Sequence, residues 1–349
     1  MNPPKMSPKE RVLTAMRHEP PDRVPHFYRD TPEVERRLLR VLELPDREAL
    51  LRRFEVDFRW IAPEYVGPEL HIDETHRWNI WGVEFEYIPL DVGGHWQTRA
   101  FPLEGTTDPK ALDDYPWPRL GWFDFASLAD QAARYADYAT MTAPGPASPG
   151  ILAVVQDLVG LERGLTDPIV NRPFFEALIE RILEFQLPFV EWMIASAGGL
   201  DFFRMGDDFG TQRGLLLSPA QWRETFGPAL KAVADAAKAA GATYYYHHSC
   251  GGIRPLIGDL IDIGVDVLDP IQVRAEGMEP ASLKRDFGDR LCFSGGVDGT
   301  ADPAPWNAGG GQGRDAPPLR NLGRRWRVFP GADAQFPGGY PDGEYCGRV

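Results

Sequence analysis

Hydrophobic and polar positions recur along the chain with two periods, and each period marks one type of element. Between residues 173 and 197 apolar side chains are spaced by three and four, which is typical of a helix with one buried face. Short apolar runs without this spacing lie between such segments and predict buried strands. We expect strands at residues 23–28, 56–61, 138–142, 201–205, 243–247, 265–268 and 291–294.

Helical patterns follow these strands almost one for one. Ser7 and Glu10 have the spacing of a capping box, and Ser218-Pro219 begins another helix with an N-cap followed by proline. We expect helices from Ser7 to about Pro20 and at residues 31–42, 46–54, 151–160, 173–197, 218–241, 253–263 and 279–287. The alternation predicts an α/β fold with a parallel sheet, and seven such strands favour a (β/α)8 TIM barrel over residues 1–298. Residues 78–103 alternate with a period of two, which indicates a β-hairpin inserted beside the barrel.

The last 51 residues have a different composition. Residues 299–349 hold 11 of the 36 glycines and 7 of the 33 prolines, and they contain no Lys, Ile, Met, Ser or His. A segment so poor in core-forming side chains is expected to be disordered, so the eighth strand–helix unit of the barrel would be missing or scrambled. We interpret this tail as translation in a shifted reading frame. A gene whose alternative frame lacks a strand–helix ending would contradict this interpretation.

Composition and charge limit the classes of function. A chain that is 43% hydrophobic and 25% charged is globular, and its net charge of −14 argues against nucleic acid or an anionic membrane as the main partner. Three cysteines cannot form a disulfide framework, and no apolar run approaches the roughly 20 residues that span a bilayer. We therefore expect a cytoplasmic protein that acts on a small-molecule substrate, and the sequence leaves its oligomeric state open.

Polar residues are concentrated near the predicted strand ends, where (β/α)8 barrels carry their active sites. The candidates for substrate or cofactor binding are Arg29, Asp57, Arg59, Asp208, Gln212, Asp269 and Gln272. The candidates for catalysis are Asp207, His248 and Asp298. One of Asp207 and Asp208 is expected to point inward, where it would orient a substrate or carry a proton, but both could instead cap the following turn.

A His-Ser-Cys sequence after the fifth strand has the most specific chemistry. His248 and Cys250 are two residues apart, so on a strand their side chains share one face. Imidazole and thiolate are both good zinc ligands, and a catalytic zinc typically has three protein ligands. A buried imidazole and thiol beside a tight Gly251-Gly252 turn is the alternative. Cys292 lies in an apolar strand and is expected in the core.

Taken together, these motifs resemble the uroporphyrinogen decarboxylase superfamily, which also contains zinc-dependent, methylcobalamin-using methyltransferases. The resemblance stops abruptly after Asp298 and implies a (β/α)8 barrel. It is carried by Ser7-Pro8-Lys9-Glu10-Arg11, Pro21-Asp22-Arg23-Val24-Pro25, Asp207 to Gly214 with Ser218-Pro219, His248-Ser249-Cys250-Gly251, Gly264 to Gln272, and Phe293 to Asp298.

The methyltransferase-like branch is the closer of the two in motif. Its members carry a His-x-Cys pair and a later cysteine as zinc ligands. His248 and Cys250 match the pair, whereas Cys346 lies in the tail without the family's surrounding pattern. The resemblance therefore implies zinc on His248 and Cys250, and methyl transfer between a corrinoid and a thiol. A corrinoid protein would be the partner, and Asp207, Gln212 and Asp298 would position the substrate.

The decarboxylase branch is the alternative. Its members hold substrate carboxylates with an arginine-rich N-terminal segment, whereas Arg29 is the only arginine between Pro25 and Val34 here. Porphyrinogen decarboxylation would need an acid such as Asp57 or Asp207 to stabilise a protonated pyrrole. A non-catalytic binding protein, or an inactive product of a damaged gene, is a third possibility.

Overall fold

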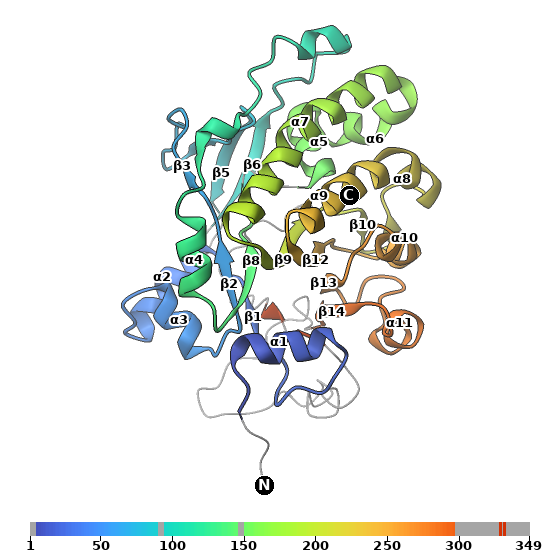
Figure 1. The fold of residues 1–349 in the computed structure, drawn as a ribbon. Helices are drawn as coiled ribbons and strands as arrows, with labels where there is room; N and C mark the ends of the chain where they lie inside the picture. The colour runs from blue at the N-terminus through green and yellow to red at the C-terminus, as the bar shows by residue number, and fades with distance from the viewer. Residues whose placement is uncertain (1–4, 90–93, 146–149, 297–327, 330, 333–349) are drawn as a thin grey trace.

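Parallel strands in the middle of the chain form the centre of the fold (Figure 1). The computed structural model describes residues 5–89, 94–145, 150–296, 328–329 and 331–332. Six strands pair in the order β14-β13-β12-β9-β8-β2, each parallel to its neighbours. They are β2 (Phe58–Ile61), β8 (Ala139–Thr142), β9 (Leu200–Gly206), β12 (Ala242–His248), β13 (Val267–Ile271) and β14 (Cys292–Gly295). With β1 (Phe27–Tyr28), all seven predicted strands are present.

Helices connect these strands and lie around the sheet (Figure 1). The α-helices are α1 (Pro8–Met16), α2 (Pro32–Val41), α3 (Arg47–Arg53), α4 (Leu128–Arg134), α5 (Ile151–Val159), α6 (Leu161–Val170), α7 (Arg172–Ser196), α8 (Pro219–Thr225), α9 (Gly227–Ala239), α10 (Ile257–Asp262) and α11 (Pro280–Phe287). Short 3-10 turns are η1 (Pro109–Leu112), η2 (Leu120–Trp122) and η3 (Arg254–Leu256). The expectation of one helix over residues 218–241 is wrong. Pro228 has no amide hydrogen and its ring crowds the preceding turn, so the chain divides at Phe226 into α8 and α9.

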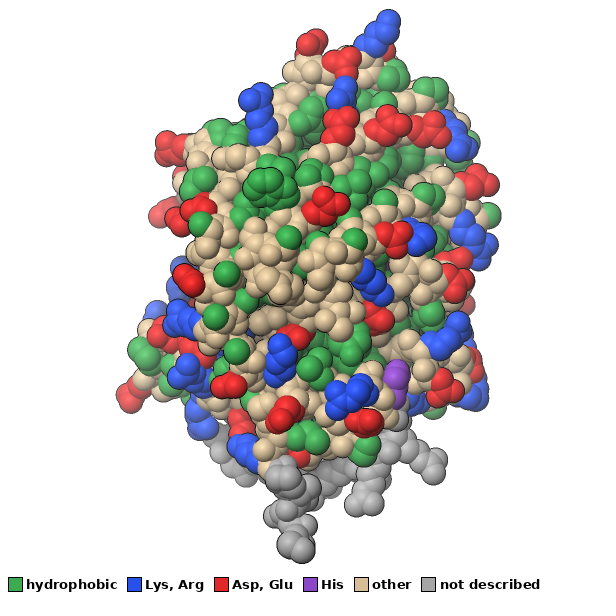
Figure 2. All heavy atoms as spheres, in the orientation of Figure 1, with side chains coloured by type: hydrophobic (Ala, Val, Ile, Leu, Met, Phe, Trp, Pro, Cys, Tyr) green, Lys and Arg blue, Asp and Glu red, His purple; other side chains and the backbone are tan. Residues whose placement is uncertain are grey.

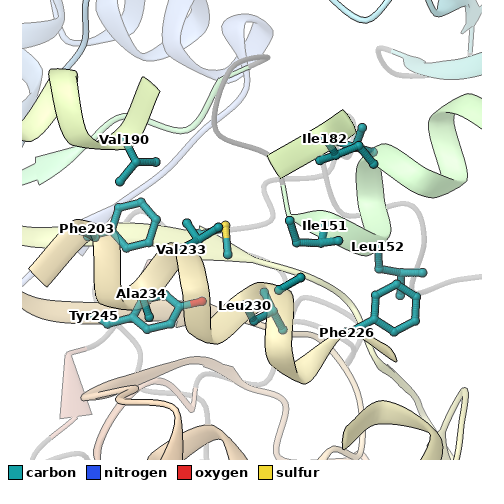
Figure 3. Packing of buried hydrophobic residues seen from close by; sticks show 14 of the residues in the cluster. Ile151, Leu152, Ile182, Val190, Phe203, Phe226, Leu230, Val233, Ala234 and Tyr245 are labelled. Atoms are coloured by element: carbon teal, nitrogen blue, oxygen red, sulfur yellow. The ribbon is translucent and has the colours of Figure 1, made fainter. Parts of the chain in front are cut away.

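Two hydrophobic clusters lie on opposite sides of the parallel strands. The outer cluster packs the helices against the sheet, with Phe203 and Tyr245 of the strands meeting Val190 of α7 and Val233 of α9 (Figure 3). The inner cluster is formed by strand residues that alternate with these: Phe27, Phe58, Ala139, Met141, Phe202, Tyr246, Val267 and Cys292. Successive strand side chains point to opposite faces, so this second set defines the barrel interior.

Helix α1 closes the interior at the end where the strands begin. Its Val12, Ala15 and Met16 belong to the inner cluster, and the capping box of Ser7 and Glu10 forms as expected. Lys9 donates its amide to the carbonyl of Asp137, just before β8, and its ammonium lies 3.0 Å from Asp201 at the start of β9. The C-terminal ends of the strands therefore lie at the other end of the barrel.

Smaller sheets flank the barrel. Residues 78–103, expected as a hairpin, contain β5 (Glu84–Pro89) and β6 (Gly94–Ala100), which pair antiparallel and are joined by β4 (His76–Trp78). Two-residue strands pair as β3 (Glu64–Tyr65) with β7 (Phe123–Asp124), and β10 (Gly210–Thr211) with β11 (Gly214–Leu215). On the face drawn in Figure 2, acidic and basic side chains are interspersed. Within the described residues, no helix is both long enough and apolar enough to cross a membrane.

Four residues of the tail lie beside the first and last strands of the barrel. Strand β15 (Val328–Phe329) pairs parallel to β14, and β16 (Gly331–Ala332) pairs parallel to β1. The expectation that the tail contains no strand is wrong for these residues, because a two-residue strand is too short to show a hydrophobic period. Most of residues 299–349 lies outside the described residues, and the interpretation of a shifted frame stays a prediction. The described strands form an α/β fold with an incomplete parallel barrel.

Candidate functional site

Three side chains that could bind a metal converge where β9 and β12 end. The ligand atoms of Asp208, His248 and Cys250 all lie within 4.8 Å of one another. His248 Nε2 is 3.7 Å from Cys250 Sγ and 3.7 Å from Asp208 Oδ1. His248 is the register partner of Gly206, so Asp208, two residues beyond Gly206, comes level with Cys250, two residues beyond His248. The sequence predicted His248 and Cys250 as metal ligands and Asp208 as a residue for substrate or cofactor binding.

The spacing of these atoms suits a zinc ion. In a tetrahedral zinc site with metal–ligand distances of about 2.0–2.3 Å, the ligand atoms lie about 3.3–3.8 Å from one another. The two 3.7 Å distances from His248 Nε2 fall in this range, and the pair of Cys250 and Asp208 atoms lies within 4.8 Å. Imidazole, thiolate and carboxylate are also donors that zinc accepts. The residues present therefore fit zinc, with Asp208 in place of the later cysteine that the family resemblance leads one to expect.

Asp269 contacts Nδ1 of His248, the ring nitrogen that does not face Asp208 and Cys250. His248 Nδ1 lies 3.0 Å from Asp269 Oδ2, and the two residues are register partners on β12 and β13. Burial raises the pKa of Asp269, but the hydrogen bond with His248 and the positive charges of Arg29 and Arg204 outweigh it, so the pKa lies below its usual value. When Nδ1–H donates to this carboxylate, Nε2 is left with its lone pair toward Asp208 and Cys250.

Backbone amides and two glutamines fix the loop that carries Cys250. The amide of Cys250 donates to Asp208 Oδ1 at 2.7 Å, and the amide of Gly251 donates to Gln272 Oε1 at 3.0 Å. Gln212 Nε2 donates to the same Gln272 oxygen at 2.9 Å. Gly251 has a φ of +84°, and a Cβ there would lie 2.4 Å from the backbone of Gly210, so the loop requires glycine. Gln212 and Gln272, both predicted binding residues, thus lie together beside the three ligands.

Asp207 points away from this group. It is 2% exposed and accepts a hydrogen bond from the amide of Ala153 at 2.8 Å, in the first turn of α5. Burial raises its pKa to about 7, although the amides of Ala153, Leu152 and Ile151 act in the opposite direction. The carboxylate, predicted as catalytic, therefore caps α5 on the outer side of the sheet.

Asp57 and Arg59 also lie away from the three ligands. Asp57 precedes β2 at the closed end of the barrel, is fully buried, and forms ion pairs with Arg11 at 2.6 Å and Arg23 at 2.7 Å. Arg59 follows the inward-facing Phe58 and so points outward, where it pairs with a glutamate of α3 and stacks on a tyrosine before β8. Asp298 lies outside the described residues.

Arg204 is a residue at this end of the barrel that sequence reasoning missed. It is 7% exposed, and its guanidinium carbon lies 5.9 Å from the centre of the Trp60 ring. Phe202, two residues earlier on β9, belongs to the inner cluster, so Arg204 faces the interior as well. Arg29, which was predicted, lies close enough for its charge to act on Asp269. Adjacent Phe202 and Phe203 give no sequence signal for which face is inward, so the position of Arg204 could not be read from the strand pattern.

Comparison with known proteins agrees with the motifs. Residues 152–301 match the family model "Uroporphyrinogen decarboxylase (URO-D)", which confirms the predicted superfamily resemblance over this stretch. The fold is similar to the solved structure of a "methyltransferase from Methanosarcina mazei", with a TM-score of 0.52 and 17% sequence identity. That similarity covers 83% of this chain and 82% of the other, and at this identity it concerns the fold alone. A comparison with curated proteins found no match.

Proposed function

We propose that this protein is a metal-dependent methyltransferase that moves a methyl group from a corrinoid to a thiol. The observation that carries the proposal is the convergence of Asp208, His248 and Cys250 at the C-terminal ends of the strands. Asp269 contacts Nδ1 of His248 there. The three converging side chains would hold zinc. When bound, zinc would keep a sulfur ligand in its thiolate form at neutral pH, which is the nucleophilic form of sulfur.

The reaction balances without another redox partner. The acceptor sulfur forms a bond to the methyl carbon, and the methyl–cobalt bond breaks with its electron pair staying on cobalt. The formally trivalent cobalt becomes monovalent, and the thiol proton leaves to solvent. The side chains of His248 and Asp208 are 13% and 18% exposed, so a thiol can reach them from the strand ends. A cytoplasmic corrinoid protein would present the methyl group, and Asp298 stays a candidate for positioning it.

Decarboxylation of a porphyrinogen is the second candidate, because the matching family model carries that name. The acids assigned to it on sequence grounds do not support it. Asp57 is paired with two arginines at the closed end, and Asp207 caps a helix on the outer side of the sheet. Neither carboxylate faces the barrel interior, where a protonated pyrrole would need one.

Zinc content and thioether formation test the proposal together. The purified chain is analysed for metal, then incubated with methylcobalamin and 2-mercaptoethanol, and the methylated thiol is measured by mass spectrometry. We expect stoichiometric zinc and zinc-dependent thioether, and loss of both in Cys250→Ser. Cys292→Ser is the matched control, because Cys292 is a second buried cysteine and packs with α1 in the inner cluster at the closed end. Metal content and thioether that are unchanged in Cys250→Ser would overturn the proposal, as would a wild-type chain that binds no zinc.

A further inference from the structure

Two hydrogen bonds run in opposite directions between the ends of β9 and β12. In one, the amide of Cys250 donates to Asp208 Oδ1 at 2.7 Å. In the other, the amide of Phe209 donates to the hydroxyl oxygen of Ser249 at 3.2 Å. Phe209 follows Asp208 in the chain, and Ser249 lies between His248 and Cys250. Ser249 is therefore bonded to the neighbour of a candidate ligand while it separates the other two.

The hydroxyl of Ser249 satisfies a buried amide. Ser249 is fully buried, and strand alternation places its side chain on the face of β12 opposite to His248 and Cys250. The ring of Phe209 is held in the outer cluster, with its centre 5.9 Å from Trp222 and 5.7 Å from Phe226. A buried amide that loses its acceptor costs free energy, so the peptide between residues 208 and 209 would turn to find another partner. Such a turn would move the carboxylate of residue 208.

Ser249 is also bonded to the residue that orients His248. Its amide donates to the carbonyl of Asp269 at 2.7 Å, and the carboxylate of Asp269 lies 3.0 Å from His248 Nδ1. One buried serine thus links the end of β9, which carries Asp208, to the end of β13. These hydrogen bonds fix the three strand ends relative to one another.

The spacing of the candidate ligands leaves little room for movement. Asp208 Oδ1 lies 3.7 Å from His248 Nε2, near the upper end of the range of about 3.3–3.8 Å for ligand atoms of tetrahedral zinc. A displacement of about 1 Å away from His248 would take the carboxylate out of this range. We propose that Ser249 is a positioning residue of this site, whose hydroxyl holds Phe209, and through it Asp208, at the spacing that zinc requires. The inference rests on the proposed function and adds to it a residue that does not touch the metal.

Zinc affinity in a double-mutant cycle tests the role of Ser249. Competition with a chromophoric chelator gives the zinc dissociation constants of the wild type, Ser249→Ala, Asp208→Ala and the double variant. We expect Ser249→Ala to weaken binding by about tenfold, as the loss of an outer hydrogen bond usually does. In the Asp208→Ala background the same change should alter the dissociation constant by less than about twofold, because Ser249 then has no carboxylate to position.

Thr142→Val is the matched control. Thr142 is fully buried, and its hydroxyl oxygen accepts a hydrogen bond from the amide of Arg204 on β9 at 2.8 Å. The change therefore removes the same kind of bond from the same strand, four residues before Asp208. Both variants should lower the urea concentration at the midpoint of unfolding, but only Ser249→Ala should weaken zinc binding.

Hydrogen exchange in the wild type keeps the test decisive if Ser249→Ala does not fold. If the bond between Phe209 and Ser249 favours zinc binding, zinc binding must favour that bond by the same factor. We therefore expect zinc to slow exchange of the Phe209 amide by about tenfold more than that of the Arg204 amide, which donates to Thr142. Exchange at the two amides is followed by NMR with and without zinc.

The outcomes separate the inference from the proposed function. Unchanged zinc affinity in a folded Ser249→Ala would overturn the inference and leave the methyltransferase proposal standing. A tenfold loss that persists in the Asp208→Ala background would also overturn it, as would zinc that slows both amides equally. A wild-type chain that binds no zinc would contradict the proposed function and the inference together.

Discussion

Removing the carboxylate behind His248 should weaken metal binding without removing a ligand. In Asp269→Ala the 3.0 Å contact with His248 Nδ1 is lost, so the imidazole is free to rotate and either nitrogen can carry its proton. The three candidate ligands remain in place. Because part of the imidazole population would present a protonated nitrogen to the metal, we expect a lower affinity rather than no binding.

The expected loss follows from the usual weight of such outer carboxylates. Replacing one typically lowers metal affinity by about 10- to 100-fold, which is about 1.4–2.8 kcal/mol. Because Asp269 is 5% exposed and also faces two arginines, we expect the upper half of this range. Competition with a chromophoric chelator measures the zinc dissociation constant for the wild type and the variant. Asp269→Asn, which can still accept a hydrogen bond, should recover part of the affinity.

Asp266→Ala is the matched control for this experiment. Asp266 precedes the same strand β13, but its carboxylate accepts a hydrogen bond from the amide of Tyr245 and lies 3.3 Å from Lys238, away from His248. Its replacement should leave zinc affinity unchanged. Equal zinc affinity in Asp269→Ala and the wild type, with affinity abolished in His248→Ala, would refute the role given to Asp269.

Two further predictions concern stability. At Gly150 a Cβ would lie 1.9 Å from Asp207 Oδ1, so Gly150→Ala should lower the free energy of unfolding by about 1–3 kcal/mol in urea, whereas Gly105→Ala, with open space around it, should change it little. The hydrogen bond from Arg11 lowers the pKa of Asp22 from 3.8 to about 2, so its stabilisation of about 2 kcal/mol is present above about pH 4 and lost as the pH falls toward 2. The stability difference between the wild type and Asp22→Asn should therefore narrow as urea melts are repeated at lower pH, and a constant difference would contradict the assignment.

The strands of the barrel could be predicted because each is a short apolar run between helical patterns. The side of each strand that faces the barrel interior could not be predicted, because a parallel strand covered on both sides is apolar on both sides. Phe202 and Phe203 lie next to each other on β9, one inward and one outward. For this reason the sequence could not say which of Asp207 and Asp208 faces the interior, and Arg204 went unnoticed.

The pair of metal ligands on one strand was visible in the sequence, and the third was not. His248 and Cys250 are two residues apart, and this local spacing is enough to place both side chains on one face. Asp208 joins them only through the register of β9 with β12, which depends on hydrogen bonds between residues about 40 positions apart in the chain. Such a contact has no local signature.

The two ends of the barrel should respond differently to the loss of a carboxylate. At the closed end Asp57 is fully buried between Arg11 and Arg23, so Asp57→Asn removes the buried carboxylate that both arginines share. Arg11 keeps Asp22 as a partner, and the change should cost about 3 kcal/mol of stability. It should not change zinc affinity, because the residue lies before β2 and the candidate ligands lie after β9 and β12. Asp269→Ala also removes a buried carboxylate, but it should lower zinc affinity, which Asp57→Asn should not. If Asp57→Asn instead folds stably and abolishes a catalytic activity, Asp57 acts on the substrate. Asp57 would then be the acid that porphyrinogen decarboxylation needs.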